Sequence, residues 1–314
     1  MSKKNRVWGM APVAACGLLL AACTHDAASG EKAKPAPPAV EYVSTWGVKG
    51  TAPGQLNDPG GIATDYFGDV YVANSGNRSI EKFRAAGNPL LSFQDDTLKQ
   101  PESISIDSGG GIYVTDPSRG SAIVFFPEGD RYRELRFKNR PSAEDFLGVT
   151  IGADAKVHVL DGDAGRVFNY TPPPFRAAGS WAVPGSVPKG KNNFGPVFAA
   201  ADGYVYVGNP LANKILRLTE EGGVVSEIAL APRDAGERAE DPFTVYNGHV
   251  LVVTGNGRVL QVFSADGMPE MTATLGSDDN GATRDVRAIA VSTHRDLFVL
   301  EGAQARVLRF RINF

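Results

Sequence analysis

The sequence predicts an all-β protein, a six-bladed β-propeller that an N-terminal strand closes by completing the last blade. The first observation is a strand-like run that recurs six times, about every 45 residues, the period of a four-stranded propeller blade. The second is that the sixth repeat ends before its fourth strand. The third is a segment near the start of the chain that resembles the missing strand.

Each run places β-branched residues around an aromatic or other large residue, a pattern that favours a strand. We interpret the runs as the second strands of six blades: 70–72, 112–114, 157–159, 205–207, 250–252 and 297–299. A short apolar strand precedes each run, most clearly at 61–63 and 288–291. A polar turn and a third strand follow, and the third strands are expected to end at Phe83, Phe126, Tyr170, Leu218, Val262 and Phe310.

The predicted fourth strands of five repeats end in large apolar residues: Phe93, Phe137, Trp181, Leu230 and Leu275. The missing sixth member matches residues 43–46, which end in Trp46. A sheet without its last strand exposes an edge and an apolar face, so we expect 41–47 to pair with the third strand of blade six, near Val307 to Phe310. The propeller then spans 41–314. An open array of repeats is the alternative, but no distinct capping repeat is visible.

The composition is that of a globular protein, with 42% hydrophobic and 21% charged residues. The net charge of −3 argues against a nucleic-acid partner, because such a protein normally carries a basic excess. Only two Cys and four His are present, which argues against a disulfide scaffold and against a structural zinc module. The sequence also contains no nucleophile elbow, Walker loop or His-Glu-x-x-His motif.

The first residues have the pattern of an export signal. Lys3, Lys4 and Arg6 precede an apolar stretch, 7–20, that is too short to span a membrane. This stretch ends in Leu20-Ala21-Ala22-Cys23, which resembles the lipobox of bacterial lipoproteins. The resemblance implies cleavage before Cys23 and acylation of that residue. An ordinary signal peptide with a chance Cys is the alternative.

We therefore expect a signal peptide at 1–22 and a lipidated, flexible tether at 23–40, in which Pro and Ala dominate. Acyl chains on Cys23 would make the membrane a partner of the protein without a transmembrane helix. Thr24 stands where an Asp would imply retention in the inner membrane. By the same resemblance, the expected location in a Gram-negative bacterium is the outer membrane, facing the periplasm.

Blade one resembles an NHL repeat. The resemblance covers 46–80 and rests on Gly54-Gln55-Leu56-Asn57-Asp58-Pro59-Gly60-Gly61-Ile62 and on Val70-Tyr71-Val72-Ala73-Asn74. It is partial in blade two, at 100–104 and 113–116, and falls to the strand pattern alone in the later blades. The resemblance implies a six-bladed propeller but leaves function open, because propellers include binding modules and several kinds of enzyme.

The ends of the second strands form a first set of candidate binding residues at the channel mouth: Asn74, Asp116, Asp161, Asn209, Thr254 and Glu301. A basic residue follows in every blade: Arg78, Arg119, Arg166, Lys214, Arg258 and Arg306. The functional interpretation is two polar rings around the mouth. The structural interpretation is that the acid or amide caps its own turn and the basic residue bonds within its blade. Recurrence in every blade favours it, because a ligand rarely has six-fold symmetry.

The connections that enter the first strands supply a second set: Asp58, Glu102, Asp145, Asn193, Asp241 and Asp285. Converging carboxylates and amides can bind Ca²⁺ or Mg²⁺. Six-bladed hydrolases of the gluconolactonase-like class use such a centre, and resemblance to them implies a metal that activates water. Solvated loop acids without a ligand are the alternative, and no cofactor is otherwise expected.

The expected function is that of an exported, lipid-anchored binding scaffold that presents its loops to a protein, peptide or glycan partner at the cell envelope. The alternatives are a metal-assisted hydrolase or lyase of the gluconolactonase-like class and a purely structural lipoprotein. We expect no catalytic His. His25 lies in the tether, His158 and His249 lie on second strands, and His294 lies in a turn on the opposite face, so they do not converge.

Overall fold

The structure is a computed structural model, and it describes residues 39–136, 147–152, 154–187, 194–199, 202–231, 241–276 and 284–314. The predicted signal peptide, Cys23 and the predicted tether up to residue 38 lie outside the described residues. Asp145 and Asn193 lie outside them as well. Within these ranges, no helix is long and apolar enough to cross a membrane.

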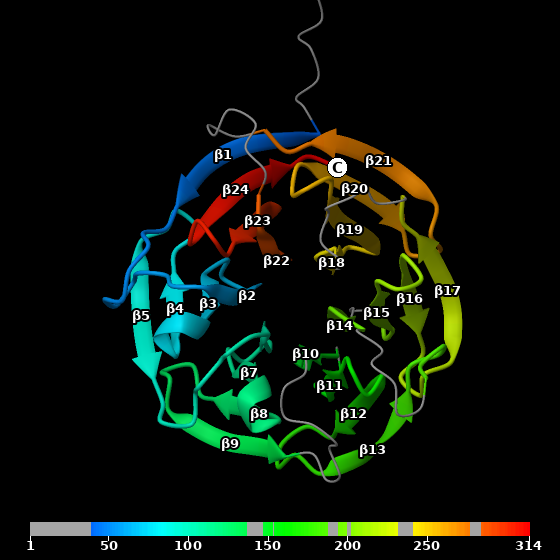
Figure 1. Ribbon diagram of the computed structural model, residues 1–314, viewed down its shortest axis with the longest axis horizontal. Helices are drawn as coiled ribbons and strands as arrows, with labels where there is room; N and C mark the ends of the chain where they lie inside the picture. Colours follow the sequence, from blue (N-terminus) through cyan, green and yellow to red (C-terminus); the bar gives the residue numbers. More distant parts are fainter. Residues whose placement is uncertain are drawn as a thin grey trace, which may run out of the picture. The chain divides into compact units, whose positions relative to one another are not determined.

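The described strands form six four-stranded antiparallel sheets arranged as a ring of blades, which confirms the predicted fold class (Figure 1). Blade one consists of β2 (Pro59–Thr64), β3 (Val70–Asn74), β4 (Ser79–Phe83) and β5 (Pro89–Gln94). Blade two consists of β6 (Ile104–Ile106), β7 (Ile112–Asp116), β8 (Ser121–Phe125) and β9 (Arg131–Arg136). Blade three consists of β10 (Leu147–Ile151), β11 (Val157–Asp161), β12 (Arg166–Tyr170) and β13 (Ala177–Ala182).

Blade four consists of β14 (Val197–Ala199), β15 (Val205–Asn209), β16 (Lys214–Leu218) and β17 (Val224–Ala229). Blade five consists of β18 (Phe243–Tyr246), β19 (His249–Thr254), β20 (Val259–Ser264) and β21 (Pro269–Thr274). Blade six consists of β22 (Val286–Val291), β23 (Asp296–Glu301), β24 (Arg306–Ile312) and β1 (Val40–Trp46). Two short 3₁₀ helices, η1 (Ser75–Asn77) and η2 (Pro117–Arg119), lie between second and third strands.

The strand β1 is the outermost strand of blade six and runs antiparallel to β24. Tyr42 lies opposite Phe310 and Trp46 lies opposite Val307, with one register shift between Tyr42 and Ser44. The strand begins at Val40, one residue before the predicted start of the domain. Residues from both ends of the chain therefore share one sheet, which leaves no blade of the ring without its fourth strand.

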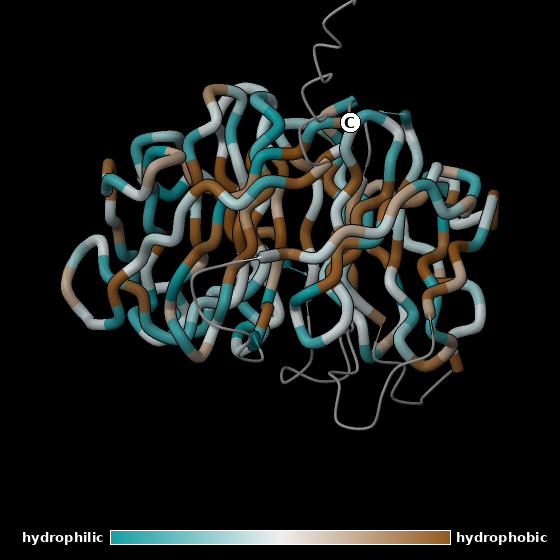
Figure 2. The backbone as a smooth tube through the Cα atoms, turned by 90° about the horizontal axis from the view of Figure 1, so that it is seen from above, coloured by the Kyte–Doolittle hydropathy of each residue, from teal (hydrophilic) through white to brown (hydrophobic). Residues whose placement is uncertain are grey.

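Six apolar clusters hold the ring together, and each joins two neighbouring blades. Figure 2 shows apolar residues along the strands. The second strands form the centre of these clusters, and five of the six are buried along their whole length because each blade face packs on a neighbour. This burial on both faces explains why the second strands appear in the sequence as continuous apolar runs. The outer strands instead mix apolar and polar residues, because one of their faces is exposed.

A glycine in the turn after a third strand receives an aromatic ring of the preceding blade. Gly87 has φ +88°, and an added Cβ would lie 2.4 Å from Cγ of Trp46. Gly129 makes the same close approach to Phe93, and Gly222 to Trp181. Only glycine both adopts this left-handed backbone conformation readily and fits into so little space.

One predicted strand end lies on the wrong face of its blade. Strand β8 ends at Phe125, which is fully buried, whereas Phe126 begins the following turn and is 46% exposed. Because two Phe residues are adjacent, the sequence pattern does not show which of them faces the blade interface. Successive strand residues point to opposite faces, so the prediction that placed Phe126 at the strand end also placed it on the wrong face. The strands β20 and β24 continue two residues past the predicted ends Val262 and Phe310, and Phe137 lies outside the described residues.

Candidate binding site at the channel mouth

The first strands of all six blades surround a central channel with a cavity volume of about 330 Å³. Its walls combine polar and apolar surface in about equal parts, and the apolar side chains include Ile62, Ile104, Val149, Phe198, Val245 and Ile289. Thr and Ser residues, together with backbone groups, supply much of the polar part. A cavity of this size with mixed walls can receive one or two side chains or a small ligand.

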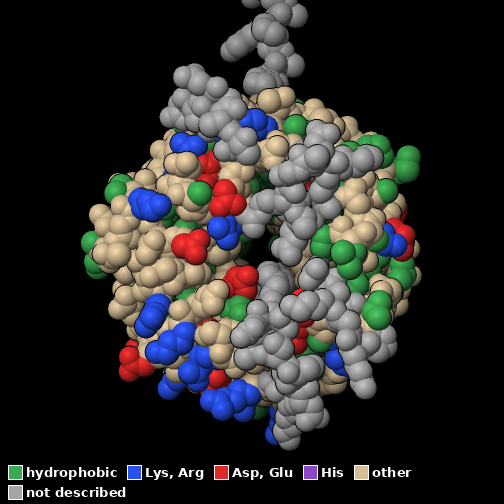
Figure 3. Space-filling model, in the orientation of Figure 1, with side chains coloured by type: hydrophobic (Ala, Val, Ile, Leu, Met, Phe, Trp, Pro, Cys, Tyr) green, Lys and Arg blue, Asp and Glu red, His purple; other side chains and the backbone are tan. Residues whose placement is uncertain are grey.

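Charged residues collect at the end of the channel where the first strands begin. Glu102 and Arg287 line the cavity itself, at the entrances of β6 and β22. The Arg287 guanidinium lies 3.0 Å from Asp285 and 3.4 Å from Asp58, so one cation sits between two carboxylates. Acidic and basic side chains are visible beside the central opening over β2 and β22 (Figure 3). The mouth is therefore charged along blades six, one and two.

The described residues on the opposite side of the mouth are mostly apolar. Pro196 and Pro242 line the channel directly before β14 and β18, and Phe243 follows. Asp241 stands next to Pro242 and is half-buried. The described part of the mouth thus combines an acidic half, along blades six, one and two, with these apolar side chains and Asp241.

Four of the predicted entrance residues can be placed, namely Asp58, Glu102, Asp241 and Asp285, and all four lie at or beside this mouth. Asp58 has a positive φ of 44°, a backbone conformation that Asp tolerates better than most residues. The Asp285 carboxylate also accepts the backbone N–H of Ala303 at 3.2 Å, which ties the entrance of β22 to the turn after β23.

The ends of the second strands are buried and bonded to neighbouring loops. The side-chain oxygen of Asn74 accepts the backbone N–H of Asn57 at 2.7 Å, and its amide donates to the carbonyl of Gln55. Asp116 accepts the backbone N–H groups of Lys99 and Gln100. These bonds hold the loops that enter β2 and β6, so both residues have structural partners, but these partners lie in the entering loops and not in the residue's own turn.

Asp161 and Asn209 act within their own turns. Asp161 accepts the backbone N–H of Ala164 at 2.9 Å, and Asn209 accepts that of Ala212 at 3.1 Å. Neither residue lines the central channel. Their repeated position in the blades reflects a repeated turn.

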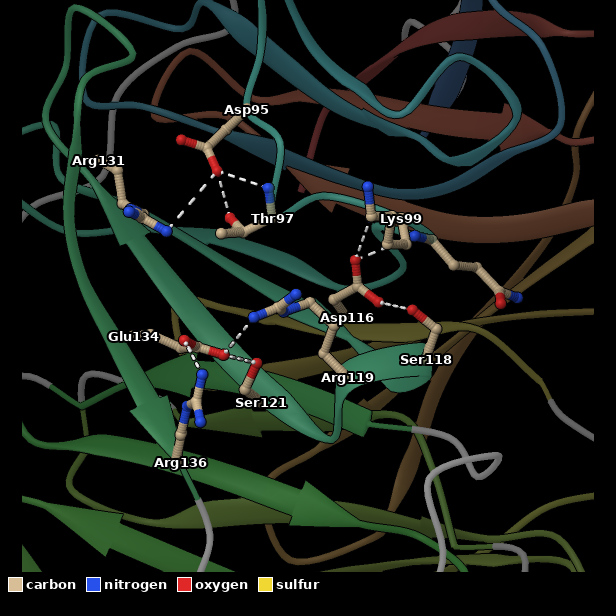
Figure 4. A network of polar contacts seen from close by, with 11 residues as sticks. Asp95, Thr97, Lys99, Asp116, Ser118, Arg119, Ser121, Arg131, Glu134 and Arg136 are labelled. Carbon is tan, nitrogen blue, oxygen red and sulfur yellow. Dashed lines mark hydrogen bonds and ion pairs between the residues drawn. The ribbon is translucent and has the colours of Figure 1, made fainter.

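Three of the basic residues that follow the second strands bind the outer strands of their own blades. In blade two, Arg119 lies 3.3 Å from Glu134 of β9, while Asp116 accepts the Ser118 hydroxyl (Figure 4). Burial disfavours ionisation of Glu134, but hydrogen bonds from Arg136 and Ser121 outweigh it and lower its pKa. Similar bonds join Arg166 to Ser180 and Lys214 to Glu227.

Glu301 is fully buried between two guanidinium groups. Arg284, which is also fully buried, places Nε 3.3 Å from Oε1 of Glu301, and Arg306 bonds to Oε2. Arg284 also donates to the carbonyls of Gly257 and Leu275 in blade five, at 3.1 Å each. This triad joins blades five and six, so Glu301 has a structural position inside the ring.

The three described His residues lie on different elements, and none lines the channel. His158 is buried in β11 with Nδ1 2.9 Å from Oδ1 of Asn169. Burial lowers the pKa of His158, and the hydrogen bond with Asn169 offsets only part of that shift. His249 begins β19 and contacts Glu270, while His294 lies in the turn between β22 and β23.

Within the described ranges, no three His, Cys, Asp or Glu side chains come together as ligands for a metal ion. The mouth carboxylates of Asp58 and Asp285 share Arg287 instead. A guanidinium in that place is a poor neighbour for a divalent cation, because it adds a positive charge where the metal would sit. The described residues therefore do not fit the metal centre that a gluconolactonase-like enzyme would need.

The sequence did not lead us to Arg287 or to the side chains that line the channel. The signal for Arg287 was present in β22, where Arg287, Ile289 and Val291 alternate with small or outward-facing residues. Reading that alternation as an inner-strand pattern would have placed a guanidinium at the channel entrance. The walls come from short strands such as β6, which has three residues and too little sequence for a periodicity.

No protein-family model matches the chain, and a search of curated proteins finds no significant match. The resemblance of blade one to NHL repeats therefore stays a prediction. The fold is nevertheless shared with solved structures. A streptogramin B lyase superposes with a TM-score of 0.64 at 14% identity, over 86% of this chain and 98% of the lyase.

A virginiamycin B lyase from Staphylococcus aureus gives a TM-score of 0.59 at 13% identity and covers 80% of each chain. A Bacteroides thetaiotaomicron protein of unknown function gives a TM-score of 0.64 at 12% identity, over 87% of this chain and 76% of its own. At such low identities, these similarities show the β-propeller fold alone.

Proposed function

We propose that this protein is a binding scaffold and that the channel mouth recognises a peptide with a cationic group next to an apolar side chain. The observation that supports the proposal is the pairing of an acidic half-mouth with apolar side chains in a channel of about 330 Å³. The cationic group would lie beside Glu102, and the apolar side chain would enter the channel between Ile62 and Phe198.

The charge balance of the described mouth favours a cation. Asp58, Glu102, Asp241 and Asp285 supply four carboxylates, and the guanidinium of Arg287 contacts two of them. A concave surface with one dominant sign of charge and low-dielectric walls focuses its field on an incoming ligand. A Lys or Arg side chain or a free amino terminus has the matching charge.

The lyases that share the fold supply a rival, in which the channel would hold a reacting substrate. The described channel residues include no His or Cys, and the only charged groups are Glu102 and Arg287. Such a lining offers binding groups more readily than a nucleophile with its own base. The residues that line the channel therefore favour a binding scaffold over a lyase.

Peptide titration tests the proposal. A fluorescein-labelled Gly-Leu-Lys-Gly peptide should bind the wild-type protein, and the matched Gly-Leu-Glu-Gly peptide should not. Glu102→Gln should weaken binding of the lysine peptide roughly five-fold, about the worth of one partly solvated ion pair. Arg287→Gln should tighten it, because two carboxylates lose the cation between them. Fluorescence polarisation gives both dissociation constants.

The control is Glu128→Gln, which removes the same charge from an exposed turn between β8 and β9, away from the channel. This variant should bind the lysine peptide like the wild type. Equal affinity for the two peptides, or equal loss in Glu102→Gln and Glu128→Gln, would contradict recognition at the mouth.

The location of the scaffold is the second part of the proposal. We propose that the NHL-like propeller is exported and attached to a bacterial membrane by lipid on Cys23, and that it faces the periplasm from the outer membrane in a Gram-negative cell. The lipobox-like Leu20-Ala21-Ala22-Cys23 at the end of a short apolar stretch supports it. Membrane attachment would place the mouth within reach of envelope proteins.

Replacement of the lipid-bearing residue tests this location. In Cys23→Ala, the protein should leave the membrane fraction or retain its signal peptide, because the only expected acylation site is gone. Cell fractionation and the mass of the mature N-terminus measure both outcomes. Wild-type fractionation and processing in Cys23→Ala would contradict lipid attachment.

A further inference from the structure

The turn between β2 and β3 carries two exposed aromatic side chains at its tip. Tyr66 is 73% exposed and Phe67 is 76% exposed. Their rings lie edge to face with centroids 5.9 Å apart. Both are among the most exposed large apolar side chains of the described residues, and they are adjacent.

The turn holds this pair rigidly. The Asp65 carboxylate accepts the backbone N–H groups of Phe67 at 3.0 Å and of Asp69 at 2.9 Å. Lys82 lies 3.2 Å from the carboxylates of both Asp65 and Asp69. The two rings are therefore presented by a turn whose own polar groups are satisfied, and a preorganised surface loses little entropy on binding.

Blade two shows that this turn does not need aromatic residues. Asp107 accepts the backbone N–H groups of Gly109 and Gly111 in the same way, at 2.8 Å each. A tyrosine hydroxyl, from Tyr71 in blade one and Tyr113 in blade two, bonds to the Asp in both turns. The residues that correspond to Tyr66 and Phe67 are a serine and a glycine. The aromatic tip therefore serves something other than the turn.

The tip lies on the face of the ring opposite the charged mouth. Strand β2 starts at the mouth and ends at Thr64, directly before the turn. The backbone carbonyl of Tyr66 accepts the Thr293 hydroxyl at 2.9 Å, which joins the tip to the β22–β23 turn. In that turn, the carbonyl of Arg295 accepts the backbone N–H of Ile312 at 3.0 Å, and Ile312 pairs with Val40.

These contacts place the tip on the same face as the entry of the chain into the propeller. A lipid on Cys23 would be joined to the propeller through Val40, on this face and not on the face with the mouth. The basic side chains of Arg84 and Arg295 are exposed beside the tip, whereas the nearby Asp65, Asp69 and Asp296 are buried. Aromatic rings flanked by exposed cations suit the headgroup region of an anionic bilayer.

We propose that the turn at residues 65–69 docks the propeller on the lipid bilayer, with Tyr66 and Phe67 in the headgroup region and the channel mouth facing away. The inference rests on the proposed lipid attachment. Attachment raises the effective concentration of the face at the bilayer, so even a weak aromatic contact would be occupied. The docked orientation leaves the mouth open to a partner in solution.

Lipid quenching at a reporter residue tests the docking. The full-length protein, as processed and acylated by the cell, is placed in vesicles of phosphatidylethanolamine and phosphatidylglycerol with brominated acyl chains. Tyr66→Trp adds a fluorophore at the tip, and wild-type emission is subtracted. The added emission should shift to the blue and lose most of its intensity in brominated vesicles, relative to unbrominated ones.

Leu211→Trp is the matched control, because Leu211 is 71% exposed and lies in the turn after β15, on the mouth face. Its emission should not respond to bromine. A separate variant, Tyr66→Ser with Phe67→Gly, copies the tip of blade two and should melt like the wild type. A large loss of melting temperature in that variant would mean that the aromatic tip is structural, which overturns the proposal.

Sedimentation with the vesicles separates this proposal from the proposed lipid attachment. If the protein sediments but shows no quenching at position 66, lipid attachment is supported and docking through this turn is contradicted. Protein that does not sediment contradicts attachment, and docking with it. A blue shift that grows with protein density without any bromine quenching would assign the tip to contact between copies and would likewise overturn the proposal.

Discussion

A chain that begins at Lys49 should melt roughly 10–20 °C below one that begins at Ala39, because it lacks β1. Val40 and Tyr42 pack on the cluster between blades five and six, and Trp46 packs on the cluster between blades six and one. One strand thus supports two interfaces. Partial burial of these three side chains is worth about 5 kcal/mol, a large share of the roughly 5–15 kcal/mol that stabilises a typical domain.

The contact of Trp46 with Phe83, with ring centroids 4.9 Å apart, adds to this cost, because it joins the first and last blades. Val43→Ser is the control within the strand, since Val43 is 42% exposed at the register shift and should tolerate the change. Equal melting temperatures for the two truncated chains, measured by circular dichroism, would show that β1 contributes little to closure.

Glu301→Ala should destabilise the propeller by about 3–5 kcal/mol, because it removes the carboxylate that lies 3.3 Å from the buried guanidinium of Arg284. Both side chains are fully buried, so the lost interaction lies in a low-dielectric site where charge pairs are strongest. Urea unfolding measures the change in the free energy of unfolding. The residue would then matter through the junction of blades five and six rather than through a ligand.

Glu227→Ala is the matched control, because the Lys214–Glu227 pair is 2.7 Å apart but its Glu is 49% exposed. Exposed pairs contribute about 0–1 kcal/mol, so this variant should unfold almost like the wild type. Adding Arg284→Met to Glu301→Ala should recover part of the loss, since the buried guanidinium is then gone as well. Similar unfolding curves for Glu301→Ala and Glu227→Ala would contradict the role assigned to the buried triad.

The fold could be predicted from the sequence because the propeller repeats its signals. Six second strands are buried on both faces, so they appear as six apolar runs that local composition alone reveals. The role of β1 could also be predicted, because five repeats have a fourth strand and the sixth repeat lacks one. The end of β8 could not be predicted, because Phe125 and Phe126 are the same residue type. Only packing against the neighbouring blade determines which of them is buried.

The candidate site was only partly predictable. The acids at the entrances of β2, β6, β18 and β22 share a sequence position, so the repeat register brought Asp58, Glu102, Asp241 and Asp285 to one end of the channel. Their partner Arg287 has no counterpart in the other blades, and a repeat-based search passes over a residue that occurs once. The burial of Glu301 depends on Arg284, which precedes β22 and reaches across a blade interface that no local pattern describes.

Hydrogen–deuterium exchange with and without the Gly-Leu-Lys-Gly peptide tests recognition at the channel mouth most directly. The peptide should slow amide exchange at 59–64, 102–106 and 286–291, the segments that carry the acidic half-mouth and the channel wall beneath it. Exchange in the outer strands β5, β9 and β13 should stay unchanged. Protection confined to those outer strands, or no protection anywhere at saturating peptide, would contradict a recognition site at the mouth.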